Sequence, residues 1–147
     1  MEAIIFTGIQ ATGKSTFYTE RFFNTHVRIS MDLLNTRNKE QIFLDICFAV
    51  HQAFVVDNTN PGKSERSRYI QQAKLHKYRV IGYYFRSDPK EVLERNNKRT
   101  GKERISEAGI RGAYKRLEIP SYDEGFDELY YVKIRNNQFI VDSWKEG

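Results

Sequence analysis

Residues 8–16 read GIQATGKST, a complete G-x-x-x-x-G-K-S phosphate-binding loop. An apolar run at residues 3–7 precedes the loop and predicts a buried strand, and a helical pattern follows it. Glycine at positions 8 and 13 permits backbone angles that are closed to other residues, so the main chain can approach an anion closely. The sequence therefore predicts a strand, a nucleotide-binding loop and a helix, in that order.

Each part of this loop has its own expected task. The loop N–H groups and the start of the next helix form a positively polarised cradle for phosphates. Lys14 supplies a mobile positive charge for the β and γ phosphates, and the Ser15 hydroxyl suits Mg²⁺. The residues expected to bind the nucleotide phosphates are Gly8, Ala11, Thr12, Gly13, Lys14, Ser15 and Thr16. A second GKS triplet at residues 62–64 has Asp57 in place of the first glycine, so it predicts only a loop and a helix start.

Length and composition limit the possible architectures. With 147 residues, we expect one domain spanning 1–147, long enough for a proper core. No apolar run approaches the length of a membrane span, and the first strand begins too early for a signal peptide. The single cysteine, Cys47, is expected to pack in a core within a reducing compartment. Together these features predict a cytoplasmic protein without membrane contact or an evident protein partner.

Charge is distributed unevenly along the chain. Residues 86–116 hold ten Lys or Arg against five Asp or Glu, whereas residues 117–130 hold five acids and no base. A basic segment of this kind can meet nucleic acid or the triphosphate of ATP, or can simply form a solvated helix face. Charge alone favours a polyanionic substrate only weakly.

Strand-like runs alternate with helical patterns, which predicts a mostly parallel sheet between helices. The expected architecture is an α/β three-layer sandwich of the P-loop NTPase type with a helical lid at about 95–112. In such a sheet, ligands bind at the carboxyl ends of the strands. Strands are expected at residues 3–7, 26–30, 53–57, 80–85, 131–134 and 139–141, and helices at residues 15–23, 42–50, 63–77, from 88 onward, and 106–118.

Two acids follow predicted strands and are candidates for chemistry. Asp32 comes after the second strand, where a carboxylate could accept the proton of an attacking hydroxyl, although a helix N-cap explains it equally well. Asp57 ends the third strand, where it resembles an acid that binds Mg²⁺; the alternative is a turn residue. The polar residues that follow Asp57 suit a sugar or phosphate of an acceptor.

A basic helix precedes a glycine-containing loop in the predicted lid. Arg95, Lys98 and Arg99 have spacings of three and four residues, so they share one side of a helix. Such a helix suits a lid that closes over a triphosphate. A solvated charged helix is the alternative.

These motifs occur in an order that resembles the 5′-hydroxyl polynucleotide kinase domain of polynucleotide kinase/phosphatase enzymes. The resemblance runs over about residues 1–134. It rests on the phosphate-binding loop together with RISMD at 28–32, DNTNP at 57–61, RNNKR at 95–99 and EGF at 124–126. The DNTNP and RNNKR blocks make the match specific.

The resemblance implies a role for each matching position. Lys14, Ser15 and Thr16 would hold the phosphates and Mg²⁺ of ATP, and Asp32 would be the general base for a 5′-OH of DNA or RNA. Arg99 would stabilise the transferring phosphoryl group, and Arg95 would help to bind the nucleotide. The expected set is therefore catalytic Lys14, Asp32 and Arg99, metal-binding Ser15 and Asp57, and substrate-binding Asn35, Asn58, Thr59 and Asn60.

Two departures from the family pattern matter. Some members carry an arginine three residues after the base, where Asn35 stands here, and Arg37 lies nearby without being aligned. The chain also has no D-x-D-x-T phosphatase motif, so we expect it only to add phosphates.

Three hypotheses follow from the sequence. The first is an ATP-dependent polynucleotide 5′-kinase of nucleic-acid repair. The second is a P-loop kinase for a small metabolite, and the third is a nucleotide-binding module that transfers no phosphate.

Overall fold

The computed structural model describes residues 1–101 and 104–145 and contains one six-stranded sheet in the order β2-β3-β1-β4-β5-β6. The strands are β1 (Glu2–Thr7), β2 (Val27–Ile29), β3 (Phe54–Val56), β4 (Arg79–Phe85), β5 (Glu128–Arg135) and β6 (Gln138–Ser143). The helices are α1 (Lys14–Arg21), α2 (Met31–Leu34), α3 (Arg37–Val50), α4 (Lys63–Leu75), α5 (Pro89–Asn97), α6 (Glu107–Arg116) and the short 3₁₀ helix η2 (Tyr122–Glu124).

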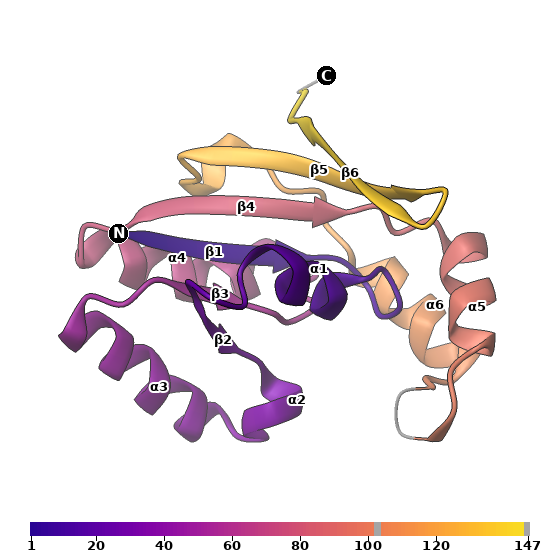
Figure 1. Cartoon of the computed structure of the whole chain (residues 1–147), viewed down its shortest axis with the longest axis horizontal. Coiled ribbons are helices and arrows are strands. Elements are labelled where there is room, and N and C mark those ends of the chain that lie inside the picture. Colours follow the sequence, from indigo (N-terminus) through magenta and orange to yellow (C-terminus); the bar gives the residue numbers. More distant parts are fainter. Residues whose placement is uncertain (102–103, 146–147) are drawn as a thin grey trace.

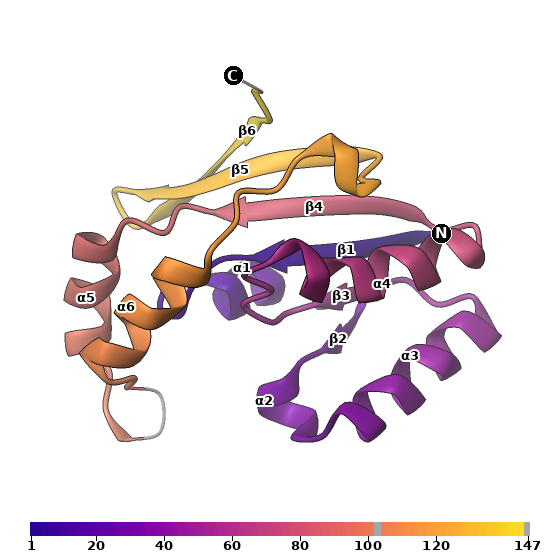
Figure 2. The ribbon, with the colours of Figure 1, turned by 180° about the vertical axis from the view of Figure 1, so that it is seen from behind.

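The sheet is parallel from β2 to β5, and only β6 runs antiparallel to its neighbour. Helix α1 lies on one face of the sheet, and α3 and α4 lie on the other (Figures 1 and 2). Helices α5 and α6 lie together beyond the end toward which β1 and β4 point (Figure 1). The predicted α/β sandwich with a helical lid is confirmed.

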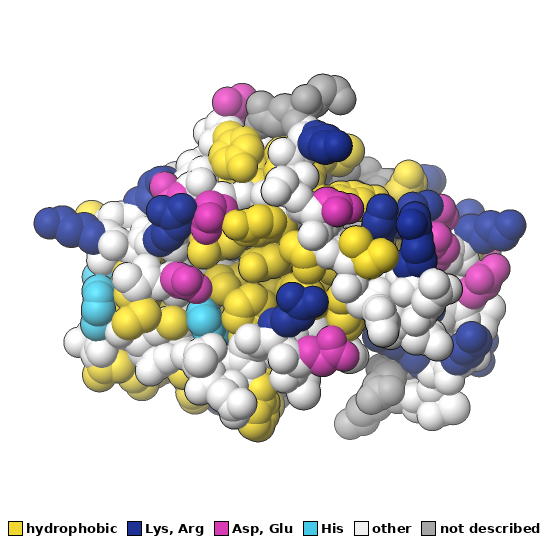
Figure 3. Space-filling model, turned by 45° about the horizontal axis from the view of Figure 1, so that its top comes forward, with side chains coloured by type: hydrophobic (Ala, Val, Ile, Leu, Met, Phe, Trp, Pro, Cys, Tyr) yellow, Lys and Arg dark blue, Asp and Glu magenta, His cyan; other side chains and the backbone are white. Residues whose placement is uncertain are grey.

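Successive side chains of β1 point to opposite faces of the sheet and pack in two separate hydrophobic cores. Ala3 and Ile5 belong to the cluster beneath α3 and α4, whereas Ile4 and Phe6 belong to the cluster on the α1 side. On the α1 side, hydrophobic side chains also gather in the middle of the molecule as seen in Figure 3. The partly buried members of that cluster are Phe22, Tyr83, Tyr130, Phe139 and Val141.

A third apolar cluster joins the lid to the phosphate-binding loop. Ile9 and Ala11 of the loop pack with Val92 of α5 and with Ile110 and Ala113 of α6, and all five are buried. Three partly buried side chains complete the cluster: Leu93, Ile105 and Leu117. The lid helices are therefore packed on the loop itself.

Helix α3 forms where the sequence predicts a helix at residues 42–50, but only part of its apolar surface packs against the rest of the protein. Ile42, Ile46 and Val50 are 49%, 53% and 66% exposed, and Phe43 is also exposed. The buried stripe comprises Glu40, Leu44, Cys47 and Phe48. This helix is apolar on two sides, and its contacts with the sheet select one of them.

Within residues 1–101 and 104–145, no helix combines the length and apolar character needed to cross a bilayer.

A buried ion pair connects two loops that lie far apart in the sequence. The Arg66 side chain on α4 is fully buried and donates from Nε and Nη2 to Glu124 at 2.8 and 3.2 Å. Its Nη1 donates to the carbonyl oxygens of Asn60 and Pro61 at 2.9 and 3.2 Å. Arg66 therefore fixes the loop after β3 to the segment that leads into β5.

We predict that Arg66→Ala lowers the free energy of unfolding by about 3–5 kcal/mol, because it leaves Glu124 buried without its counter-ion. Urea unfolding followed by circular dichroism measures this change. Arg68→Ala, at an exposed position of the same helix, is the control and should stay within about 0.5 kcal/mol of the parent. Equal effects of the two substitutions would contradict the assigned role of Arg66.

Candidate active site

The phosphate-binding loop spans the gap between β1 and α1 in a conformation that few residues tolerate. Gly13 has φ +90° and Ala11 has φ +63°, both in the left-handed region. A Cβ at Gly8 would lie 2.9 Å from the Cβ of Phe85, so only glycine fits beside β4. The Gly8 N–H also donates to the Thr59 carbonyl at 3.0 Å, which fixes the loop against the segment after β3.

The Lys14 side chain is folded back into the loop. Its ammonium donates to the Ile9 carbonyl at 2.9 Å and lies 3.5 Å from the Thr12 hydroxyl. Thr12 is buried and donates its own hydroxyl to the same Ile9 carbonyl at 2.9 Å. The Lys14 ammonium therefore contacts the same loop that is expected to bind the phosphates.

Burial lowers the pKa of Lys14 from 10.5 to about 8. The negative charge of Asp57 acts against this shift, the positive charge of Arg99 adds to it, and Asp32 again raises the pKa. All three residues therefore lie near enough to Lys14 to act on its charge. The sequence predicted them from separate segments, and the fold brings them to one edge of the sheet.

The two predicted metal ligands lie next to each other. The Ser15 hydroxyl donates to Oδ2 of Asp57 at 3.0 Å, and the Asp57 side chain is 2% exposed. A hydroxyl and a carboxylate are the oxygen donors that Mg²⁺ prefers, and a site with one carboxylate suits an ion that keeps several waters and phosphate oxygens. The residues present therefore fit Mg²⁺: Ser15 and Asp57 would hold the ion, and its charge would offset that of the phosphates. Among the described residues, no group of three or more His, Cys, Asp or Glu is arranged so that it could hold a metal ion.

Asp32 lies exposed in the four-residue helix α2. The start of α2 is held by Asn58, whose Oδ1 accepts from the Met31 N–H at 2.8 Å. The Asn58 amide group donates to Glu40 at 3.1 Å and to the Tyr69 hydroxyl at 3.3 Å. Asn58 thus fixes the helix that carries Asp32, and its own polar atoms are engaged internally.

A buried carboxylate that the sequence analysis missed anchors this arrangement. Glu40 is 1% exposed and accepts from the Tyr69 hydroxyl at 3.0 Å and from Arg37 Nη1 at 3.0 Å. Burial, followed by the charge of Glu40, raises the pKa of Tyr69. The Arg37 side chain remains 52% exposed at the edge of this cluster. The sequence feature that could have identified Glu40 is its position four residues before Leu44, because it is the one acid on a helix stripe that is otherwise apolar.

The remaining acceptor candidates differ in exposure. Asn35 is exposed and ends α2 with φ +68°. Thr59 is half-buried, and its carbonyl holds Gly8. Asn60 is buried and donates to the Phe6 carbonyl at 2.8 Å, so its side chain supports the end of β1.

The lid arginines reach the loop from α5. Arg95 Nη1 donates to the Ala11 carbonyl at 3.0 Å, and Arg95 also pairs with Glu91 at 3.6 Å. Arg99 follows α5, is half-buried and acts on the pKa of Lys14. Asn96, which the sequence analysis did not single out, is buried and accepts from the Ile105 N–H at 2.8 Å, closing the lid loop. Lys102 of the predicted lid loop lies outside the described residues.

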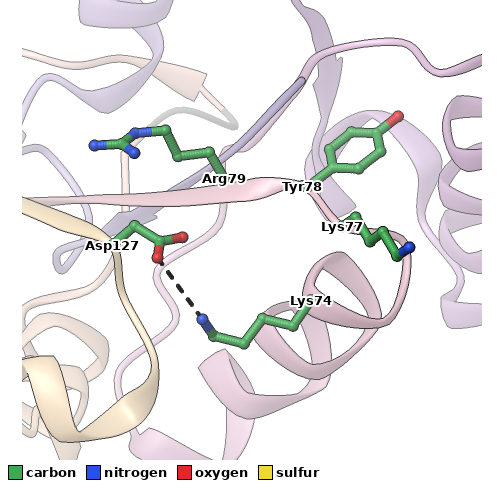
Figure 4. Close-up of a pocket in the computed structure, with 5 residues that line it drawn as sticks. All are labelled: Lys74, Lys77, Tyr78, Arg79 and Asp127. Atoms are coloured by element: carbon green, nitrogen blue, oxygen red, sulfur yellow. Dashed lines mark ion pairs between the residues drawn. The ribbon is translucent and has the colours of Figure 1, made fainter.

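Another basic cluster lies at the opposite end of the strands. Lys74, Lys77 and Arg79 line a shallow pocket where β4 begins, together with Tyr78 and Asp127 (Figure 4). Lys74 pairs with Asp127 at 3.9 Å and Arg79 with Glu128 at 3.3 Å. This cluster is remote from the carboxyl ends of the strands, so we exclude it from the candidate site.

Solved structures share this fold at low sequence identity. A gluconokinase from Sinorhizobium meliloti 1021 has TM-score 0.64 and 16% identity, with 90% of this chain and 82% of that chain covered. Kti12 from Chaetomium thermophilum, solved with ADP-AlF3, has TM-score 0.63 and 17% identity, with 89% and 88% covered. A structure of the PezAT toxin–antitoxin system of Streptococcus pneumoniae has TM-score 0.65 and 12% identity, with 95% and 70% covered. These similarities show that the chain shares the fold of these proteins, in agreement with the phosphate-binding loop of its sequence.

Two curated relatives narrow the comparison. One relative is a protein of Acanthamoeba polyphaga mimivirus that is provisionally named a bifunctional polynucleotide phosphatase/kinase. It is 26% identical over an alignment 155 residues long with gaps counted, and the alignment covers 99% of this chain and 37% of the relative. The bifunctional polynucleotide phosphatase/kinase of Schizosaccharomyces pombe is 23% identical over 149 residues, with 97% and 36% covered. The chain therefore spans little more than a third of each relative. No protein-family model matches it. The similarity to polynucleotide phosphatase/kinases that the motifs indicated is confirmed.

We predict that nucleotide affinity falls by roughly tenfold between about pH 7 and about pH 9. Phosphates bind the charged ammonium, and a Lys14 pKa of about 8 means that the free protein loses this proton as the pH rises through that value. Titration calorimetry with ADP at several pH values, in buffers of different ionisation enthalpy, measures both the affinity and the proton uptake. Lys14→Met is the control and should bind weakly without this dependence. An unchanged affinity of the parent protein across the range would refute the assignment.

Proposed function

We propose that this chain is an ATP-dependent polynucleotide kinase that transfers the γ-phosphate to the 5′-OH end of DNA or RNA. The strongest support is the position of Asp32, an exposed carboxylate near Lys14 whose helix is held by Asn58 of the DNTNP block. A base must be accessible to its substrate, and Asp32 is exposed on a helix whose first residue is hydrogen-bonded to Asn58. The names of the two curated relatives support the same substrate class.

The proposed reaction assigns one task to each group. The 5′ oxygen attacks the γ-phosphorus while its proton passes to Asp32, and the bond to the bridging oxygen of ADP breaks. Lys14 and Arg99 stabilise the charge on the transferring phosphoryl group, and Arg95 keeps the loop in place through the Ala11 carbonyl. Ser15 and Asp57 would hold Mg²⁺, which neutralises phosphate charge.

The chain spans little more than a third of each bifunctional relative, and its phosphate-binding loop supports the kinase half of their named activities for this chain. The sequence carries no D-x-D-x-T phosphatase motif. We therefore propose phosphate addition alone, in the setting of nucleic-acid repair.

The deciding experiment is transfer of radiolabelled γ-phosphate from ATP, with Mg²⁺, to DNA and RNA oligonucleotides that end in 5′-OH. We expect label on these strands and none on matched strands that already carry a 5′-phosphate. Acceptor affinity should fall as salt rises, because a polymer releases counterions when its phosphates are bound. ATP binding without transfer to either polymer would refute the proposal and redirect the search to small hydroxyl-bearing metabolites.

We predict that Asp32→Asn lowers the transfer rate by at least about a hundredfold, because an amide cannot accept the proton. ATP affinity and the melting temperature should stay near parent values, because Asp32 is exposed. Asp45→Asn, the same substitution at an exposed site on α3, is the control and should leave the rate unchanged. Loss of ATP binding by Asp32→Asn would instead make Asp32 a nucleotide or metal ligand.

A further inference from the structure

Arg28 contacts both candidate metal ligands. It lies on β2 opposite Val55 of β3, and its Nε donates to Oδ2 of Asp57 at 2.9 Å. Its Nη2 donates to the Ser15 hydroxyl at 3.1 Å, and that hydroxyl donates to the same Asp57 oxygen at 3.0 Å. The three side chains form a closed triangle, and the positive charge of the guanidinium lies where a divalent cation would be expected.

The charge balance explains why this triangle forms. The Asp57 side chain is 2% exposed, and a buried carboxylate is costly unless it is paired and hydrogen-bonded. Lys14 directs its ammonium toward the Ile9 carbonyl and the Thr12 hydroxyl. Within the described residues, the charged group that hydrogen-bonds Asp57 is therefore Arg28, whose side chain is 28% exposed.

A divalent cation and the guanidinium would compete for the same two oxygens. Mg²⁺ demands near-octahedral geometry with oxygen ligands at about 2.0–2.1 Å, and it is repelled by a cation that stays bound to its ligands. We propose that Arg28 is a resident counter-ion of the metal site. It holds Ser15 and Asp57 in position without metal, and it leaves them when a divalent cation binds. This inference rests on the proposed function in that Ser15 and Asp57 are taken as the Mg²⁺ ligands.

One functional consequence is an order of binding. The free protein should bind divalent cations weakly, because entry of the ion means displacing an arginine from a buried acid. The phosphates of an arriving nucleotide bring negative charge that offsets both cations. Arg28 would therefore couple metal binding to nucleotide binding, a task different from that of the lid arginines Arg95 and Arg99.

The test measures Mn²⁺ binding to the nucleotide-free full chain by the electron paramagnetic resonance signal of free Mn²⁺. We expect Arg28→Gln to bind Mn²⁺ at least roughly tenfold more tightly than the parent, because the competing cation is gone. Adding ADP should reduce the difference between the two proteins. Arg68→Gln removes the same charge from an exposed site and should match the parent.

A purely structural ion pair would give another result. Arg28→Gln would then melt at a lower temperature while its Mn²⁺ affinity was unchanged or weaker, and that outcome would overturn the proposal. Arg28→Lys keeps a positive charge near Asp57 but lacks the guanidinium group that also reaches Ser15, so this variant replaces Arg28→Gln in the test if the glutamine variant does not fold. The Mn²⁺ affinity of Arg28→Lys should be higher than that of the parent, and equal Mn²⁺ affinities would again overturn the proposal. No acceptor is present, so failure of phosphoryl transfer and failure of this inference are separate results.

Discussion

The candidate site depends on the parallel pairing of β1 with both of its neighbours, β3 and β4. Because β3 and β4 both run alongside β1, the segments that follow all three strands emerge at one edge of the sheet. The phosphate-binding loop is then held from both sides, since the Gly8 N–H donates to Thr59 after β3 and the Ile9 N–H donates to Ser87 after β4. The loop conformation is thus a property of the whole sheet, and not only of its own glycines.

Much of this organisation could be predicted from the sequence. The loop motif has few alternatives, and the apolar runs before the loop and before Asp57 predict two strands. Parallel β-α units place the residues that follow such strands at one edge of the sheet, and there the oxygens of Ser15 and Asp57 are 3.0 Å apart. Position along a parallel strand is a strong constraint, because it determines at which edge a residue emerges.

Other features could not be predicted, for physical reasons. Asn58, Thr59 and Asn60 suit a ligand and an internal hydrogen bond equally well, and only the fold decides between them; the side chain of Asn60 is buried. The periodicity of α3 identified a helix but not its buried stripe, because Ile42 and Ile46 are as apolar as Leu44. Glu40 looked like one of many surface acids until Tyr69 and Arg37 were placed beside it by α4 and by the first turn of α3.

The packing of the lid has a consequence for motion. Ile9 and Ala11 of the loop share an apolar cluster with Val92, Ile110 and Ala113 of α5 and α6, so these helices are not a flap joined only by a hinge. Swinging them away would expose the underside of the nucleotide cradle to water, at a cost of about 25 cal/mol for each Å² of apolar surface uncovered. Under the proposed function, the cradle is therefore expected to keep its shape while nucleotides exchange.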